Sequence, residues 1–280
     1  MKVQTNKLAT LFPALQNGTA TLTSYLLENQ AEFSAGRVRR AVVICPGGGY
    51  AYTSAREAEP IALQFLANDI VAFVLDYSVA PIHYPQQLLE ASAAVAWVRR
   101  NSATLSIDPN DIAICGFSAG GHLAASLGTM WQEEFLAEQL GLAPGENRPD
   151  RMILGYPVIS GSECRHAGSF TNLLGVENDL PAVRDQQSPN LRVTANCCPA
   201  FIWATAQDSC VPAQSSLLLA LAMAKQGIRY ELVVYSSGEH GLSLANKITA
   251  APQDNKALLE PRAAGWVQQC LSWWEELDGQ

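Results

Sequence analysis

One serine in a glycine frame constrains this chain more than any other feature. Ser118 lies in the sequence Gly-Phe-Ser-Ala-Gly, after an apolar run at residues 111–115 that predicts a strand and before helix formers at residues 122–127. A sharp turn between strand and helix requires Gly116 and Gly120, because a side chain at either position would collide with the neighbouring strand or helix. Such a turn lifts the serine hydroxyl beside the first N–H groups of a helix, a geometry that suits nucleophilic acyl transfer. A purely structural glycine–serine turn is the alternative for this motif taken alone.

Strand and helix patterns alternate along the chain. The expected strands cover residues 20–28 (an early edge strand), 38–45, 69–76, 111–115, 152–158, 200–206 and 230–235. The expected helices cover residues 57–68, 86–100, 122–127, 214–225 and 261–277, with Pro261 in the first turn of the last one and a turn at residues 108–110. This alternation predicts an α/β fold with a mostly parallel central sheet and helices on both faces. In such sheets the chemistry gathers at the carboxyl ends of the strands.

Residues 160–198 interrupt the alternation. They lack regular periodicity and are rich in glycine, serine, asparagine and proline. We therefore expect a loop or small cap inserted over the sheet, within a single domain of residues 1–280.

Composition narrows the class of protein. The net charge of −8 argues against a nucleic-acid partner. No apolar stretch is long enough to cross a bilayer and no signal-peptide pattern is evident, so we expect a cytoplasmic protein without a membrane partner. The seven cysteines are an odd number without Cys-x-x-Cys spacing, which favours reduced thiols over a disulfide framework or a zinc site. A disulfide between the adjacent Cys197 and Cys198 stays open, as does the oligomeric state, with a homodimer as one option.

Acyl transfer by a serine needs a base that takes its proton and an acid that orients the base. His240 follows the expected strand at residues 230–235, and a turn at the carboxyl end of a strand is where such a base must lie. Asp208 follows the strand before it, with room for one helix and one strand between the two residues. The order Ser118, Asp208, His240 is that of a catalytic triad on an α/β sheet. A role for Asp208 only as a helix cap is the alternative.

The other three histidines are given other roles. His122 lies one helical turn beyond Ser118 and is expected to be structural, because its side chain points the wrong way for a base. His83 lies in a proline-flanked loop that could border the cleft, so it is a pocket candidate. His166 lies in the irregular insert and is expected at the surface.

Three consecutive glycines follow the strand at residues 38–45. We expect Gly48 and Gly49 to aim backbone N–H groups at a substrate carbonyl, with the N–H of Ala119 completing an oxyanion hole. A phosphate-binding loop of the Walker type is excluded because no Lys-Ser/Thr pair follows. Tyr50, directly after the glycines, is the second pocket candidate.

Three residues near these loops are expected to be structural. Trp203 lies inside an expected strand and should pack in the core. Arg56 and Glu57 are expected to form the solvated start of a helix.

Together these motifs resemble the α/β-hydrolase superfamily over roughly residues 20–276, and more closely the bacterial acetylxylan-esterase-like carboxylesterases related to the hormone-sensitive-lipase group. The segments that carry the resemblance are Pro46–Tyr50, Asp76–Tyr77 with Ala80–Pro81, Gly116–Leu123, Asp208–Pro212 and Gly238–Gly241. The resemblance implies hydrolysis of short acyl esters, often acetyl groups on sugars or xylo-oligosaccharides, without a cofactor or metal. Pro46 departs from the related His-Gly-Gly-Gly form, and the insert has no recognisable sugar-binding signature.

Two other functions stay open at this stage. An amidase or peptidase, such as an arylformamidase-like enzyme, would use the same triad, so the sequence does not separate esters from activated amides. A ligand-binding homologue without catalysis is the alternative from a different class. It is disfavoured because Ser118, Asp208 and His240 are all present.

Overall fold

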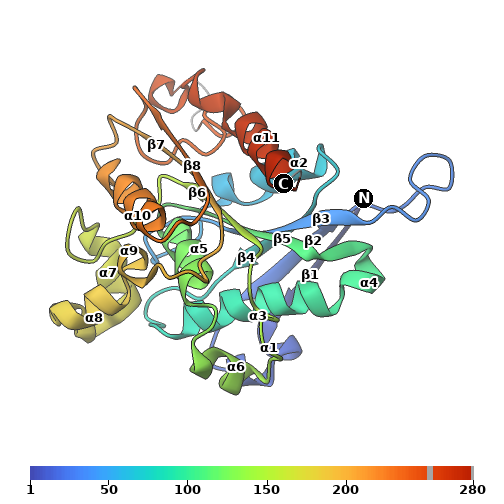
Figure 1. The fold of residues 1–280 in the computed structure, drawn as a ribbon, viewed down its shortest axis with the longest axis horizontal. Helices are drawn as coiled ribbons and strands as arrows, with labels where there is room; N and C mark the ends of the chain where they lie inside the picture. Colours follow the sequence, from blue (N-terminus) through green and yellow to red (C-terminus); the bar gives the residue numbers. More distant parts are fainter. Residues whose placement is uncertain (251–254, 279–280) are drawn as a thin grey trace.

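The computed structural model describes residues 1–250 and 255–278. Its centre is an eight-stranded sheet in the order β1-β2-β4-β3-β5-β6-β7-β8 (Figure 1). The strands are β1 (Lys2–Lys7), β2 (Thr21–Leu26), β3 (Arg39–Cys45), β4 (Val71–Asp76), β5 (Ile107–Phe117), β6 (Arg151–Gly155), β7 (Ala200–Thr205) and β8 (Tyr230–Tyr235). The β1–β2 and β2–β4 pairs are antiparallel, and all later pairs are parallel. The predicted fold class, an α/β-hydrolase sheet, is confirmed.

Helices cover both faces of this sheet (Figure 1). They are α1 (Leu8–Leu11), α2 (Glu59–Leu66), α3 (Gln86–Arg100), α4 (Ser102–Leu105), α5 (Ser118–Met130), α6 (Glu134–Leu140), α7 (Ala167–Leu174), α8 (Pro181–Gln186), α9 (Pro189–Arg192), α10 (Gln214–Lys225) and α11 (Trp266–Asp278). Short 3-10 turns are η1 (Pro13–Leu15), η2 (Ala55–Glu57), η3 (Gly175–Asp179), η4 (Lys256–Leu258) and η5 (Ala263–Gly265). Buried side chains of α3, α5, α6 and α10 pack on one face, and those of α2 and α11 pack on the other. Among the described residues, no helix combines the length and apolar character needed to cross a bilayer.

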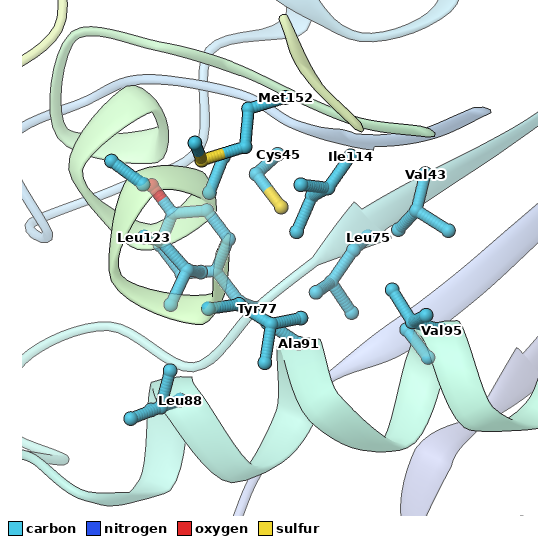
Figure 2. Close-up of a cluster of buried hydrophobic side chains, with 14 of the residues drawn as sticks. Val43, Cys45, Leu75, Tyr77, Leu88, Ala91, Val95, Ile114, Leu123 and Met152 are labelled. Carbon is cyan, nitrogen blue, oxygen red and sulfur yellow. The ribbon is translucent and has the colours of Figure 1, made fainter. Parts of the chain in front are cut away.

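The core is split into two layers by the alternation of side chains along the strands. On β3, Val43 belongs to the layer under α3, whereas Val42 and Ile44 belong to the layer under α2 and α11. Figure 2 shows the first layer, in which Val43 and Leu75 of the sheet face Val95 of α3. Because both faces are covered, these strands read as continuous apolar runs, which is why the sequence pattern finds them.

The second layer is rich in aromatic rings. Trp203 on β7 is fully buried and its ring stacks on Trp266 of α11, with centroids 5.5 Å apart. The prediction that Trp203 packs in the core is therefore confirmed.

The structure differs from the sequence-based expectations at both ends of the chain and at residues 108–110. β1 was not expected, because its sequence is polar and its residues are mostly exposed, and it places β2 inside the sheet rather than at its edge. Residues 108–110 are part of β5 rather than a separate turn. The last helix begins at Trp266, so Pro261 lies before η5 and not in its first turn.

The segment at residues 160–198 is helical rather than irregular. It contains α7, η3, α8 and α9, which lie together beside α5 in Figure 1. Each helix is only one or two turns long, too short for a 3.6-residue hydrophobic pattern to stand out in the sequence.

Candidate active site

Ser118 occupies the junction where β5 ends and α5 begins. Its φ angle of 52° is in the left-handed region, which a residue with a side chain enters at an energetic cost. Two glycines allow the turn: a Cβ at Gly116 would lie 2.1 Å from the carbonyl oxygen of Gly120, and a Cβ at Gly120 would lie 2.1 Å from that of Cys45. The predicted steric need for both glycines is confirmed.

His240 links the serine to a buried carboxylate. Its Nε2 lies 2.8 Å from the Oγ of Ser118, and its Nδ1 lies 2.6 Å from Oδ2 of Asp208. Since an ionised carboxylate only accepts hydrogen bonds, the proton is assigned to Nδ1, which leaves Nε2 free to accept the serine proton. Ser118 and Asp208 are almost fully buried, while His240 is partly exposed.

Asp208 is held in place by its second oxygen. Oδ1 accepts the N–H groups of Cys210 and Val211 at 2.9 and 2.8 Å. The carboxylate therefore orders the turn after β7 and faces His240 at the same time. Asp208 therefore caps the backbone of its own turn and does not cap α10, which begins only at Gln214.

The glycine loop after β3 presents free backbone donors. Gly48 and Gly49 have φ angles of 131° and 65°, and among the described residues no acceptor is found for their N–H groups. The carbonyl oxygen of Gly48 points the other way and accepts the N–H groups of Ala51 and Tyr52, which closes the loop. The N–H of Ala119 lies in the first turn of α5, where helical N–H groups have no partner within the helix.

These groups meet in an open cleft of about 670 Å³. Ser118 and His240 line it together with Gly48, Gly49, Arg56 and His166. The cleft thus joins a polarised serine, a base and free N–H donors. This combination has the parts that acyl transfer requires.

Comparison with known proteins assigns this chain to a family. The family model BD-FAE matches residues 27–223. The chain belongs to the BD-FAE family. An endo-1,4-beta-xylanase B from Butyrivibrio fibrisolvens is 36% identical over 74% of this chain, and an acetylxylan esterase from Xylanibacter ruminicola is 32% identical over 86% of it. The chain spans only 33% and 47% of the lengths of these two relatives.

A solved structure extends the similarity to nearly the whole chain. An acetyl ester-xyloside bifunctional hydrolase from Caldicellulosiruptor lactoaceticus has 35% sequence identity and a TM-score of 0.78, covering 93% of this chain and 89% of that protein. The resemblance to acetylxylan-esterase-like hydrolases that the motifs carry is confirmed.

Both pocket candidates lie outside the cleft of this BD-FAE family member. Tyr50 is buried beneath the glycine loop, where its hydroxyl lies 2.8 Å from Nδ1 of His122. His83 is exposed, and its Nδ1 lies 2.8 Å from the carbonyl oxygen of Asn172. The two predictions are wrong because closeness in sequence to a loop does not determine which side of that loop a ring packs against.

The structural role predicted for His122 is confirmed. Its ring is buried between the hydroxyl of Tyr50 and the carbonyl oxygen of Gln187, the latter 2.7 Å from Nε2. Burial lowers the pKa of His122 to about 4, so the ring is neutral at physiological pH.

Three cleft residues were placed wrongly by the sequence. His166 lines the cleft instead of the surface, and its Nδ1 accepts the N–H of Ser169 as the N-terminal cap of α7. Arg56 lines the cleft and donates to the carbonyl oxygen of Gly241. Glu57 is buried, with 3% of its surface exposed. A histidine three residues before a serine is compatible with a helix cap, but no pattern in the sequence marks Glu57 as buried.

The cysteines and the acidic and histidine side chains form no disulfide and no metal-binding group among the described residues. All seven cysteines, including Cys197 and Cys198, are free thiols. Within residues 1–250 and 255–278 no group of three or more His, Cys, Asp and Glu side chains is arranged to hold a metal ion.

Proposed function

We propose that this protein is a serine carboxylesterase that hydrolyses short acyl esters. The observation that carries the proposal is the hydrogen-bonded series Ser118–His240–Asp208, which opens into a cleft with free N–H groups. The names of relatives with esterase or acetyl ester hydrolase activity support the same conclusion.

In the first half of the reaction, the Oγ of Ser118 attacks the ester carbonyl while its proton moves to Nε2 of His240. Asp208 stabilises the imidazolium that forms. The N–H groups of Gly48, Gly49 and Ala119 donate to the oxyanion of the tetrahedral intermediate. His240 then gives its proton to the leaving alcohol, which departs and leaves an acyl group on Ser118.

In the second half, water takes the place of the alcohol. His240 removes a proton from the water as its oxygen attacks the acyl carbonyl, and the same oxyanion donors act again. Collapse of this intermediate breaks the bond to Ser118, and His240 returns the proton to Oγ. The products are one carboxylic acid and the free enzyme, with no cofactor consumed.

The acyl group we propose is acetyl, and the alcohol a sugar or another polyol. An acetylxylan esterase and an acetyl ester-xyloside hydrolase among the relatives support this choice. The polar side chains that line part of the cleft, Thr53, Ser54, Arg56 and His166, support a hydroxyl-rich alcohol rather than a lipid.

A substrate panel tests the proposal. Nitrophenyl esters from acetate to decanoate, acetylated xylose and xylo-oligosaccharides, and a matched aryl amide would be compared by kcat/KM. We expect a maximum between acetyl and butyryl esters, because a small acyl pocket gains little from extra methylenes and soon clashes with them. Each such methylene changes binding by roughly 1–3 kcal/mol. A maximum at decanoyl, activity only at an oil–water interface, or preference for the amide would contradict the proposal.

A further inference from the structure

Glu57 places a carboxylate directly beneath the glycine loop. Its Oε2 accepts the N–H of Gly47 at 2.8 Å, and its side chain is buried. A Cβ on Gly47 would lie 2.7 Å from this oxygen and 3.0 Å from the Cβ of Ser118, so the loop, the carboxylate and the serine are in close contact. The bond to Gly47 fixes the peptide immediately before the free N–H groups of Gly48 and Gly49.

The other carboxylate oxygen reaches the loop that carries His240. Oε1 accepts the hydroxyl of Tyr156 at 2.6 Å, and this hydroxyl accepts the N–H of Ser243 at 2.9 Å. The Tyr156 and His240 rings also pack in a T-shaped arrangement, with centroids 5.1 Å apart. One carboxylate therefore connects the segment before the oxyanion donors with the segment after the base.

This arrangement is costly for folding. Burial raises the pKa of Glu57, which means that the folded protein disfavours the charged form. The titratable or charged groups around it are Arg56, Tyr77, Cys115, Tyr156 and His240. An apolar residue would avoid the cost, so a carboxylate here indicates a role beyond stability.

We infer that Glu57 is a positioning residue that sets the glycine loop and the His240 loop relative to Ser118, acting through Gly47 and Tyr156. The inference rests on the proposed esterase function and adds a residue to it. Two acceptors are needed at one point, and the paired oxygens of a carboxylate supply both. A glutamine has a single carbonyl oxygen, so one of the two donors would lose its acceptor.

The test compares Glu57→Gln with Glu90→Gln on nitrophenyl acetate. Glu90 is a matched control because it is fully buried, its pKa is also raised by burial, and it accepts the N–H and hydroxyl of Ser78 outside the cleft. We expect Glu57→Gln to lower kcat roughly 10- to 100-fold with KM nearly unchanged, because oxyanion donors act mainly on the transition state. We expect Glu90→Gln to lower Tm but leave kcat within about twofold.

A double variant separates positioning from general loss of stability. Tyr156→Phe keeps the ring against His240 but removes the hydroxyl. If both residues act through the same bonds, the loss in kcat of the Glu57→Gln/Tyr156→Phe double variant should be smaller than the product of the two single losses.

Equal behaviour of Glu57→Gln and Glu90→Gln, or fully multiplicative losses with Tyr156→Phe, would overturn the inference. Should Glu57→Gln fail to fold, Tyr156→Phe decides the question: a lower kcat with KM nearly unchanged supports the inference, and an unchanged kcat overturns it. An inactive wild-type protein would instead count against the proposed function, so the two failures are distinguishable.

Discussion

The Oγ of Ser118 lies 2.8 Å from Nε2 of His240, although the two residues are 122 positions apart in the chain. Ser118 follows β5, whereas His240 follows β8 at the edge of the sheet, with β6 and β7 between them. The contact is made above the carboxyl ends of parallel strands, where loops from different strands converge. Neither side chain is part of the apolar layers that stabilise the sheet.

Ser118→Ala and His240→Ala should each abolish turnover while leaving the fold intact. In a comparable triad single removals cost on the order of 10⁴–10⁶ in rate, because nucleophile and base act as one unit. Asp208→Asn should cost less than, or as much as, these changes, since an amide favours the wrong imidazole tautomer. Steady-state kinetics on purified protein, with circular dichroism as the control, measure this. Robust hydrolysis by Ser118→Ala would refute the assignment.

Two neighbouring glycines offer a matched test of the glycine loop. A Cβ at Gly48 would lie 2.0 Å from the carbonyl oxygen of Tyr52, whereas a Cβ at Gly49 would meet only the Oγ of Ser169, at 3.9 Å. We expect Gly48→Ala to lower kcat at least roughly 100-fold, about the loss of one oxyanion donor. Gly49→Ala should lose less, despite its strained φ. Unchanged kcat in a folded Gly48→Ala protein would make the loop a simple structural turn.

His166 should contribute to recognition of the alcohol rather than to chemistry. Its Nδ1 is occupied by Ser169, and among the described residues Nε2 has no partner, so an N–H donor is left in the cleft. Serine also caps helices well, so His166→Ser should keep α7 folded while removing this donor. We expect kcat/KM for acetylated xylose to fall roughly tenfold and that for nitrophenyl acetate to stay constant. Equal losses on both substrates, or none, would contradict this role; His83→Ser is the control outside the cleft.

The buried His122 should make stability depend on pH. An unfolded histidine takes up its proton near pH 6.5, but burial lowers the pKa of His122 to about 4 in the folded protein. As pH falls from 6.5 towards 4, the unfolded state binds a proton that the folded state does not, so stability decreases by about 3 kcal/mol. Urea unfolding of wild type and His122→Asn across this range should show their difference shrinking by that amount. A difference independent of pH would mean that the ring is not held neutral.

The sequence identifies those parts of the site that follow recognisable strands. Ser118, Asp208 and His240 each follow a strand of the parallel part of the sheet, and their order limits how the ends of these strands meet. β1 was not predicted, because its side chains are polar and its place in the sheet depends on backbone pairing with β2.

Glu57, Tyr50 and His166 show where sequence reasoning fails. Whether a glutamate after a loop is solvated or buried depends on a tyrosine 99 residues away, here Tyr156. Tyr50 points into the core because its hydroxyl meets the ring of His122, which lies 72 residues further along the chain. Such placements are decided by tertiary contacts that leave no periodic signal.

Covalent labelling of Ser118 tests the central claim most directly. Wild-type protein and Ser118→Ala would be treated with a fluorophosphonate probe, and the labelled peptide identified by mass spectrometry. A serine activated by His240 should form one stable adduct on Ser118, and the Ser118→Ala protein should remain unlabelled. No adduct on folded wild-type protein, or an adduct on another residue that persists in Ser118→Ala, would contradict the proposal that this cleft is a serine esterase site.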